Sequence, residues 1–138
     1  KIPTTFMKVV PALNLSSETP EQWVVLRIST EDNIDIPYYK VFGGWRGGYL
    51  DGDRWKLNSG ITKVEEDDDY FYFYGYSGSC YKCHKRGYGL KEGRRHFSLY
   101  CQGVLEDLIE KAEIGASINI KIMPEETNWK ELNKNKHE

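Results

Sequence analysis

The residues of this chain best suited to hold a metal lie within one window, residues 80–101. It contains all three cysteines of the chain and two of its three histidines. The spacing Cys80-x2-Cys83-x12-His96-x4-Cys101 matches in number a zinc site with three thiolates and one imidazole, with His84 as a substitute ligand. On a strand, however, Cys80 and Cys83 would point to opposite faces. The sequence therefore leaves two interpretations, a structural zinc or cysteines that serve only to pack the core.

The same window carries a cluster of cations with aromatic rings between them. Cations can hold phosphates and flat rings can stack on bases, so the segment could form a surface for RNA or single-stranded nucleic acid. The alternative is a solvated hairpin tip and loop, and the formal net charge of −2 speaks against a general polyanion binder. The residues concerned are Tyr81, Lys82, Lys85, Arg86, Tyr88, Lys91, Arg94 and Arg95.

Just before this cluster, residues 70–76 form a ladder of alternating tyrosines and phenylalanines. Successive strand residues point to opposite faces, so one set of rings should enter the core and the other should stay outside. We predict that Phe71 and Phe73 are the core side. The outer side is then available for contact with a partner, unless the C-terminal segment around Trp129 covers the ladder. The outer side of the ladder consists of Tyr70, Tyr72, Tyr74 and Tyr76.

An acidic run, residues 65–69, precedes the ladder, and together with the basic segment it predicts charge-steered docking onto a protein. By itself the run is typical of a solvated strand connection. Support for an enzyme is slight, since the chain contains no GxSxG, Walker, HExxH or Rossmann motif. Metal-dependent nucleases pair acids with a lysine on adjacent strands, and one set of residues could form such a site: Asp51, Asp53, Lys56 and Lys63.

The elements that would position these residues follow from turn signals and periodicity. Turns recur about every ten residues between short β-prone runs, which predicts an antiparallel meander. Cys101, Leu105 and Leu108 belong to a helical stripe, so a helix is expected over about 98–113 and a strand over 116–123. Thr19-Pro20-Glu21 looks like a helix start. The other predicted strands cover 4–13, 23–29, 38–42, 54–57, 61–66, 70–76 and 79–86. The fold class is α+β, a curved antiparallel meander with one main helix packed on one face.

The bulk composition limits the remaining choices. At 138 residues the chain is expected to form one domain over 1–132 with a frayed polar tail over 133–138. It has no apolar run approaching the roughly 18 residues that a membrane span requires. An odd number of clustered cysteines and the absence of a signal-like N-terminus predict a cytoplasmic protein.

These observations favour binding over catalysis. We expect a protein partner to dock on the aromatic hairpin of residues 70–86 and the adjacent basic loop, residues 87–96. Small chains with aromatic hairpins also suit viral or phage proteins that inhibit or regulate a host factor. The alternatives are a single-stranded nucleic-acid or RNA-binding module, with or without a structural zinc, and a small metal-dependent nuclease or hydrolase.

Overall fold

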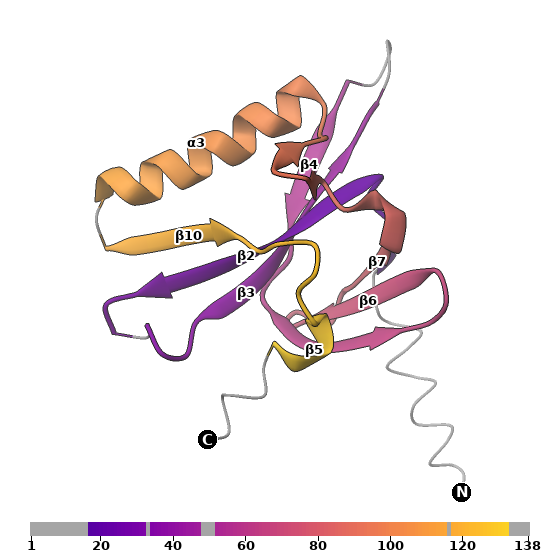
Figure 1. The fold of residues 1–138 in the computed structure, drawn as a ribbon, viewed down its shortest axis with the longest axis horizontal. Helices are drawn as coiled ribbons and strands as arrows, with labels where there is room; N and C mark the ends of the chain where they lie inside the picture. Colours follow the sequence, from indigo (N-terminus) through magenta and orange to yellow (C-terminus); the bar gives the residue numbers. More distant parts are fainter. Residues whose placement is uncertain (1–16, 33, 48–51, 116, 133–138) are drawn as a thin grey trace, which may run out of the picture.

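The computed structural model describes residues 17–32, 34–47, 52–115 and 117–132. In this part of the chain, two four-stranded sheets and one long helix, α3 (Leu99–Gly115), make up most of the fold (Figure 1). The predicted α+β class is confirmed. The first predicted strand, 4–13, and Asp51 lie outside the described residues. The strands are β1 (Ser17–Glu18), β2 (Gln22–Thr30), β3 (Tyr38–Trp45), β4 (Arg54–Leu57), β5 (Ile61–Glu66), β6 (Tyr70–Gly75), β7 (Cys80–His84), β8 (Leu90–Lys91), β9 (Arg94–Arg95) and β10 (Ile118–Ile122).

The long sheet has the order β10-β2-β3-β4, and all its neighbours are antiparallel. Its central strand β2 is buried on both faces, since Val24, Val25 and Leu26 are consecutive and each is at most 1% exposed. Helix α3 packs along this sheet, mainly against β10 (Figure 1). Cys101 and Leu105 from the predicted stripe are the buried helix residues, so the helix is positioned by its apolar side.

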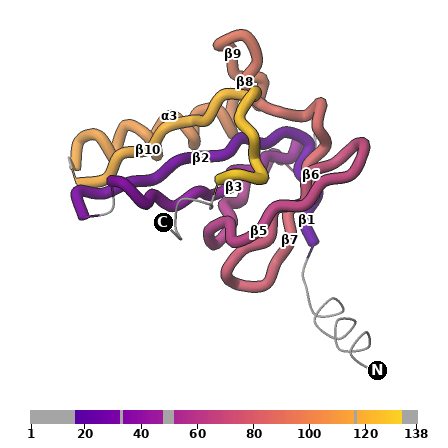
Figure 2. The backbone as a smooth tube through the Cα atoms, turned by 60° about the horizontal axis from the view of Figure 1, so that its bottom comes forward, coloured from indigo at the N-terminus to yellow at the C-terminus, as the bar shows by residue number. Residues whose placement is uncertain are grey.

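The hairpin sheet has the order β1-β7-β6-β5. Strands β6 and β7 pair as the predicted hairpin, with Tyr70 opposite His84 and Tyr74 opposite Cys80. Gly78 closes the turn with a φ of 92°, a conformation that glycine adopts without strain. Strand β1 runs parallel to β7 at one edge. Figure 2 shows this sheet at the opposite end of the molecule from the junction of α3 and β10.

An aromatic cluster between the elements forms the centre of the core. The Trp23 ring of β2 contacts Phe73, Tyr88 and Trp129 at centroid distances of 5.3, 4.7 and 5.8 Å. Its Nε1 donates to the carbonyl oxygen of His84 at 2.8 Å, which satisfies the buried indole. Trp129 belongs to the short 3-10 helix η2 (Trp129–Glu131), so the C-terminal segment closes the core.

Two local predictions were wrong. No helix begins at Pro20; the chain passes directly from β1 to β2, and Pro20 is buried closely against Gly43 of β3. The basic loop is a short hairpin, β8 and β9, whose turn residues Glu92 and Gly93 both have positive φ, 54° and 76°. Positive φ at both central turn positions is the conformation that suits a two-residue hairpin. Within the described residues, no helix has the length and apolar character needed to cross a membrane.

Candidate functional site

The outer face of the hairpin sheet gathers the predicted tyrosines. The register of β5, β6 and β7 places Glu65, Tyr72 and Lys82 side by side on this face. Phe71, Phe73 and Cys83 lie on the other face, toward Trp23 and the core. The predicted orientation of the ladder is confirmed for Phe73, which is fully buried. We call the outer surface the tyrosine face, and it comprises Lys63, Glu65, Tyr70, Tyr72, Tyr74, Lys82 and His84.

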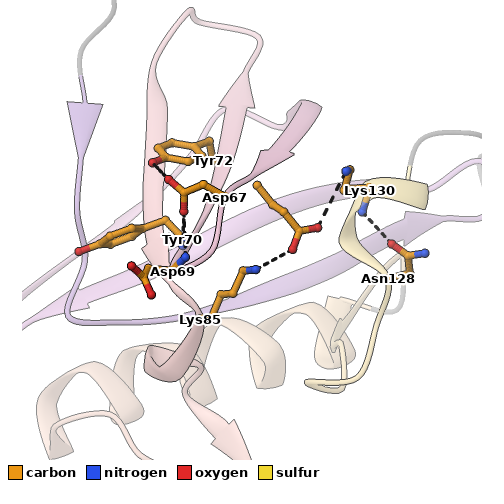
Figure 3. A network of polar contacts seen from close by, with 8 residues as sticks. Asp67, Asp69, Tyr70, Tyr72, Lys85, Asn128 and Lys130 are labelled. Carbon is orange, nitrogen blue, oxygen red and sulfur yellow. Dashed lines mark hydrogen bonds and ion pairs between the residues drawn. The ribbon is translucent and has the colours of Figure 1, made fainter.

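Two tyrosine hydroxyls on this face are held by carboxylates. The Tyr72 hydroxyl donates to Asp67 Oδ2 at 2.6 Å, and the Tyr74 hydroxyl donates to Glu65 Oε1 at 3.0 Å (Figure 3 shows the first). The hydrogen bond to Asp67 raises the pKa of Tyr72 to about 12. For Tyr74, partial burial and then the bond to Glu65 raise the pKa to about 12. Both hydroxyls therefore stay protonated and fix the orientation of their rings.

Asp67 is itself fixed by the turn between β5 and β6. Its Oδ1 accepts from the backbone N–H groups of Asp69 and Tyr70 at 2.9 and 2.8 Å (Figure 3). Together with the Tyr72 hydroxyl, the largest influence, these donors lower the pKa of Asp67 below its usual range. The end of the acidic run, after β5, is thus a structured turn that supports the tyrosine face.

Cations lie over two of the rings. Lys82 Nζ is 4.4 Å from the Tyr70 ring centre, and Lys63 Nζ is 5.2 Å from that of Tyr74. The His84 imidazole meets the Tyr70 ring edge-on at 5.0 Å. Such contacts restrict the rings to defined positions. Tyr76, just beyond β6, is 58% exposed.

The predicted acidic and basic poles are not separate surfaces. Glu66, on the acidic run, pairs with Lys85 at 2.7 Å and with Lys130 of η2 at 3.9 Å. Lys91 pairs with Glu125 at 3.8 Å. Three cations of the predicted binding cluster are therefore matched by acids within the chain, the third being Arg95, paired with Glu106 at 3.0 Å. Arg86 and Arg94 are exposed and form no ion pair with a described acid.

Two predicted contact residues belong to the core. Tyr81 is 4% and Tyr88 is 2% exposed, so neither ring can serve as an exposed contact. Tyr81 lies on the inner side of β7, where burial raises its pKa to about 12. The Tyr88 hydroxyl accepts from the N–H of Val25 and donates to the carbonyl oxygen of Met123, so it joins β2 to the segment after β10.

The predicted zinc ligands do not converge. Cys83 is buried on the inner side of β7, where burial raises its pKa well above the usual thiol value. Cys101 lies against β4, with Sγ donating to the carbonyl oxygen of Arg54 at 3.2 Å. Cys80 points to the other face of β7 from Cys83, and His96 is exposed.

The substitute ligand does not complete a site either, because the Nδ1 of His84 accepts from the N–H of Arg86 at 3.0 Å. Among the described residues, no three His, Cys, Asp or Glu side chains are close enough to hold a metal ion. The described residues therefore give the predicted zinc site no support, and all three cysteines are free and buried. In the predicted nuclease set, Lys56 pairs with Glu18 and Lys63 pairs with Glu65, neither of which is an acid of that set, and Asp51 lies outside the described residues.

Comparison with known proteins gives no further guide to function. No protein family, curated protein or solved structure matches this chain.

Proposed function

We propose that this protein is a non-catalytic binding module that docks a protein partner on the tyrosine face. The observation that carries the proposal is the row Tyr70, Tyr72 and Tyr74 on the outer side of β6, with each ring held by a hydrogen bond or a cation. Rings that are already ordered lose little conformational entropy on binding. Tyrosine also combines a large apolar area with a polar group, which makes it frequent at protein interfaces.

The mixture of charges favours a protein over a nucleic acid. Glu65 and Asp67 lie beside the tyrosines and would repel phosphates, whereas Lys63 and Lys82 alternate with them. A protein surface can complement both signs, and such complementarity sets orientation and association rate. The basic hairpin β8–β9 adds little positive field because Lys91 and Arg95 are paired. The expected partner therefore presents apolar groups surrounded by charges of both signs.

The experiment compares two double variants of the full chain as baits in a lysate of the organism from which the chain comes. Tyr72→Ala with Tyr74→Ala alters the tyrosine face, and Tyr38→Ala with Tyr100→Ala removes two exposed tyrosines elsewhere, 48% and 53% exposed. A protein captured in stoichiometric amount should be retained by the control and lost from the tyrosine-face variant. With the purified partner, we expect affinity to fall by about 100-fold or more, as for two interface hot spots.

Folding is checked first, since both variants must unfold cooperatively in urea. Equal loss of the partner from both variants would contradict the proposal. It would also fail if the captured ligand were nucleic acid whose affinity falls steeply with salt and depends on Arg94 and Arg95.

A further inference from the structure

A polar cavity lies between the two sheets, apart from the tyrosine face. Its volume is about 430 Å³, and its walls come from β1, β3, β4, β7 and the turns that follow β4 and β6. Nothing in the proposed protein docking uses this cavity. The polar side chains that matter here are Lys40, Lys56, Asn58, Ser59, Ser77 and Ser79.

Three serine hydroxyls form a chain along the wall. Ser59 Oγ accepts from the N–H of Ser77 at 2.9 Å and donates to Ser77 Oγ at 3.2 Å. Ser77 Oγ and Ser79 Oγ are 3.2 Å apart and share one hydrogen. Three hydroxyls have three hydrogens, and two are used within the chain. Whichever way the last bond runs, one hydrogen on Ser77 or Ser79 remains for a ligand.

Asn58 forms a fixed part of the cavity wall. It is 3% exposed, and its Oδ1 accepts from the N–H groups of Val41 and Gly60 at 2.9 and 3.3 Å, which fixes the orientation of the amide. Its Nδ2 has no hydrogen-bond acceptor among the described residues. The nitrogen is itself buried, so Asn58 orders the wall of the cavity and does not reach a ligand inside it.

The charge of the cavity selects the ligand. Lys40 and Lys56 contribute two positive charges, and the one acid in the lining, Glu18, pairs with Lys56 at 2.7 Å. Two cations and one carboxylate leave a formal charge of +1. The free hydroxyl hydrogen of Ser77 or Ser79 adds a neutral donor beside the two ammonium groups.

We infer that this cavity is an oxyanion site that takes a phosphate group. Donors that approach from several directions match the oxygens of a tetrahedral anion, and an ammonium group makes the strongest of these bonds. In this arrangement Lys40 supplies the charge that Glu18 does not already balance. The free hydrogen of the Ser77–Ser79 pair supplies a neutral donor.

The test is an NMR titration of the ¹⁵N-labelled full chain with sodium phosphate, against sodium chloride at equal ionic strength. We expect saturable shifts of the Ser59, Ser77 and Ser79 amides with phosphate and none of that kind at Tyr72. Lys40→Met should weaken phosphate binding about tenfold, the effect of one charge-assisted hydrogen bond. Lys121→Met changes net charge equally on exposed β10 and should leave the affinity unchanged.

A second variant, Ser79→Ala, removes one hydroxyl without changing charge and should weaken binding by a smaller factor. The inference is overturned if phosphate gives no saturable shift beyond chloride, or if Lys121→Met weakens binding as much as Lys40→Met. Glycerol 2-phosphate separates the two sources of the group. Tighter binding of the ester assigns the site to a phosphorylated molecule, and tighter binding of inorganic phosphate assigns it to the free ion.

Discussion

Strand β6 sends phenylalanines to one face of its sheet and tyrosines to the other, and the two sets of rings are stabilised differently. Phe73 is fully buried between Trp23 and Trp129, at centroid distances of 5.3 and 6.2 Å. Tyr72 and Tyr74 remain partly exposed and are held by hydrogen bonds from their hydroxyls to carboxylates. The inner rings thus contribute stability through burial, whereas the outer rings form an ordered surface that is still open to a partner.

The largest effect expected from this comparison is on stability. Phe73→Ala should lower the free energy of unfolding by about 3–5 kcal/mol, because it removes buried area and leaves a cavity between two tryptophans. Tyr72→Ala should cost a small fraction of that amount, since its ring packs on the outside. Urea denaturation followed by tryptophan fluorescence measures both. Phe73→Leu is the matched control and should retain most of the stability. Equal losses for Phe73→Ala and Tyr72→Ala would show that both faces are core.

A smaller effect concerns the ionisation of the outer tyrosines. The pKa of Tyr72 is raised to about 12 mainly by its hydrogen bond to Asp67, whereas partial burial is the first cause for Tyr74, also raised to about 12. Asp67→Asn should therefore lower the pKa of Tyr72 markedly toward 10. Glu65→Gln should lower that of Tyr74 by less. Tyrosine ¹³Cζ shifts followed against pH report each residue separately.

The sign of the accompanying stability change follows from the raised pKa. A tyrosine whose folded pKa lies above its unfolded value of 10.0 stabilises the fold below that pH, and the contribution disappears as the pH rises through 12. Asp68→Asn on the same turn is the control and should leave the pKa of Tyr72 unchanged. If Asp67→Asn also leaves the pKa of Tyr72 unchanged, the hydrogen bond from the Tyr72 hydroxyl to Asp67 does not hold the ring.

The successes of the sequence analysis came from short-range patterns. Alternation determines which residues of β6 share a face, and the chemistry of the ring determines which face is buried, so the burial of Phe73 was predictable. The three- and four-residue steps from Cys101 predicted helix α3 to within a residue or two at each end. Both patterns depend only on neighbours within one element.

The failures came from contacts between distant parts of the chain. Tyr88 reads as a surface aromatic among glycines, yet it enters the core through a bridge between its backbone and Trp23, which no local pattern indicates. The cysteines cluster in the sequence, but β7 and α3 carry them to different parts of the core. The oxyanion cavity was missed because its polar residues come from separate strands and turns.

The ion pairs between distant residues were not predicted, for the same reason. Lys85 meets Glu66 only because the register of the hairpin sheet brings their segments together. This pair gives the smallest expected effect. Lys85 lies over the inner Phe71 ring at 5.1 Å, and Lys82 lies over the outer Tyr70 ring at 4.4 Å, so the two lysines are matched, one on each face. The hydrogen bond from Lys85 is the first cause of the lowered pKa of Glu66.

Lys85→Met should therefore raise the pKa of Glu66 toward its ordinary value of 4.5, and Lys82→Met should not. Because the folded pKa is lowered, the pair stabilises the fold above the ordinary value and loses this contribution as the pH falls through the lowered one. The stability difference between Lys85→Met and the unaltered chain should thus be present at pH 7 and vanish in acid. Side-chain carboxyl NMR and urea midpoints against pH measure both. A Glu66 pKa that responds equally to Lys82→Met would mean that the general field of the hairpin, rather than this pair, sets it.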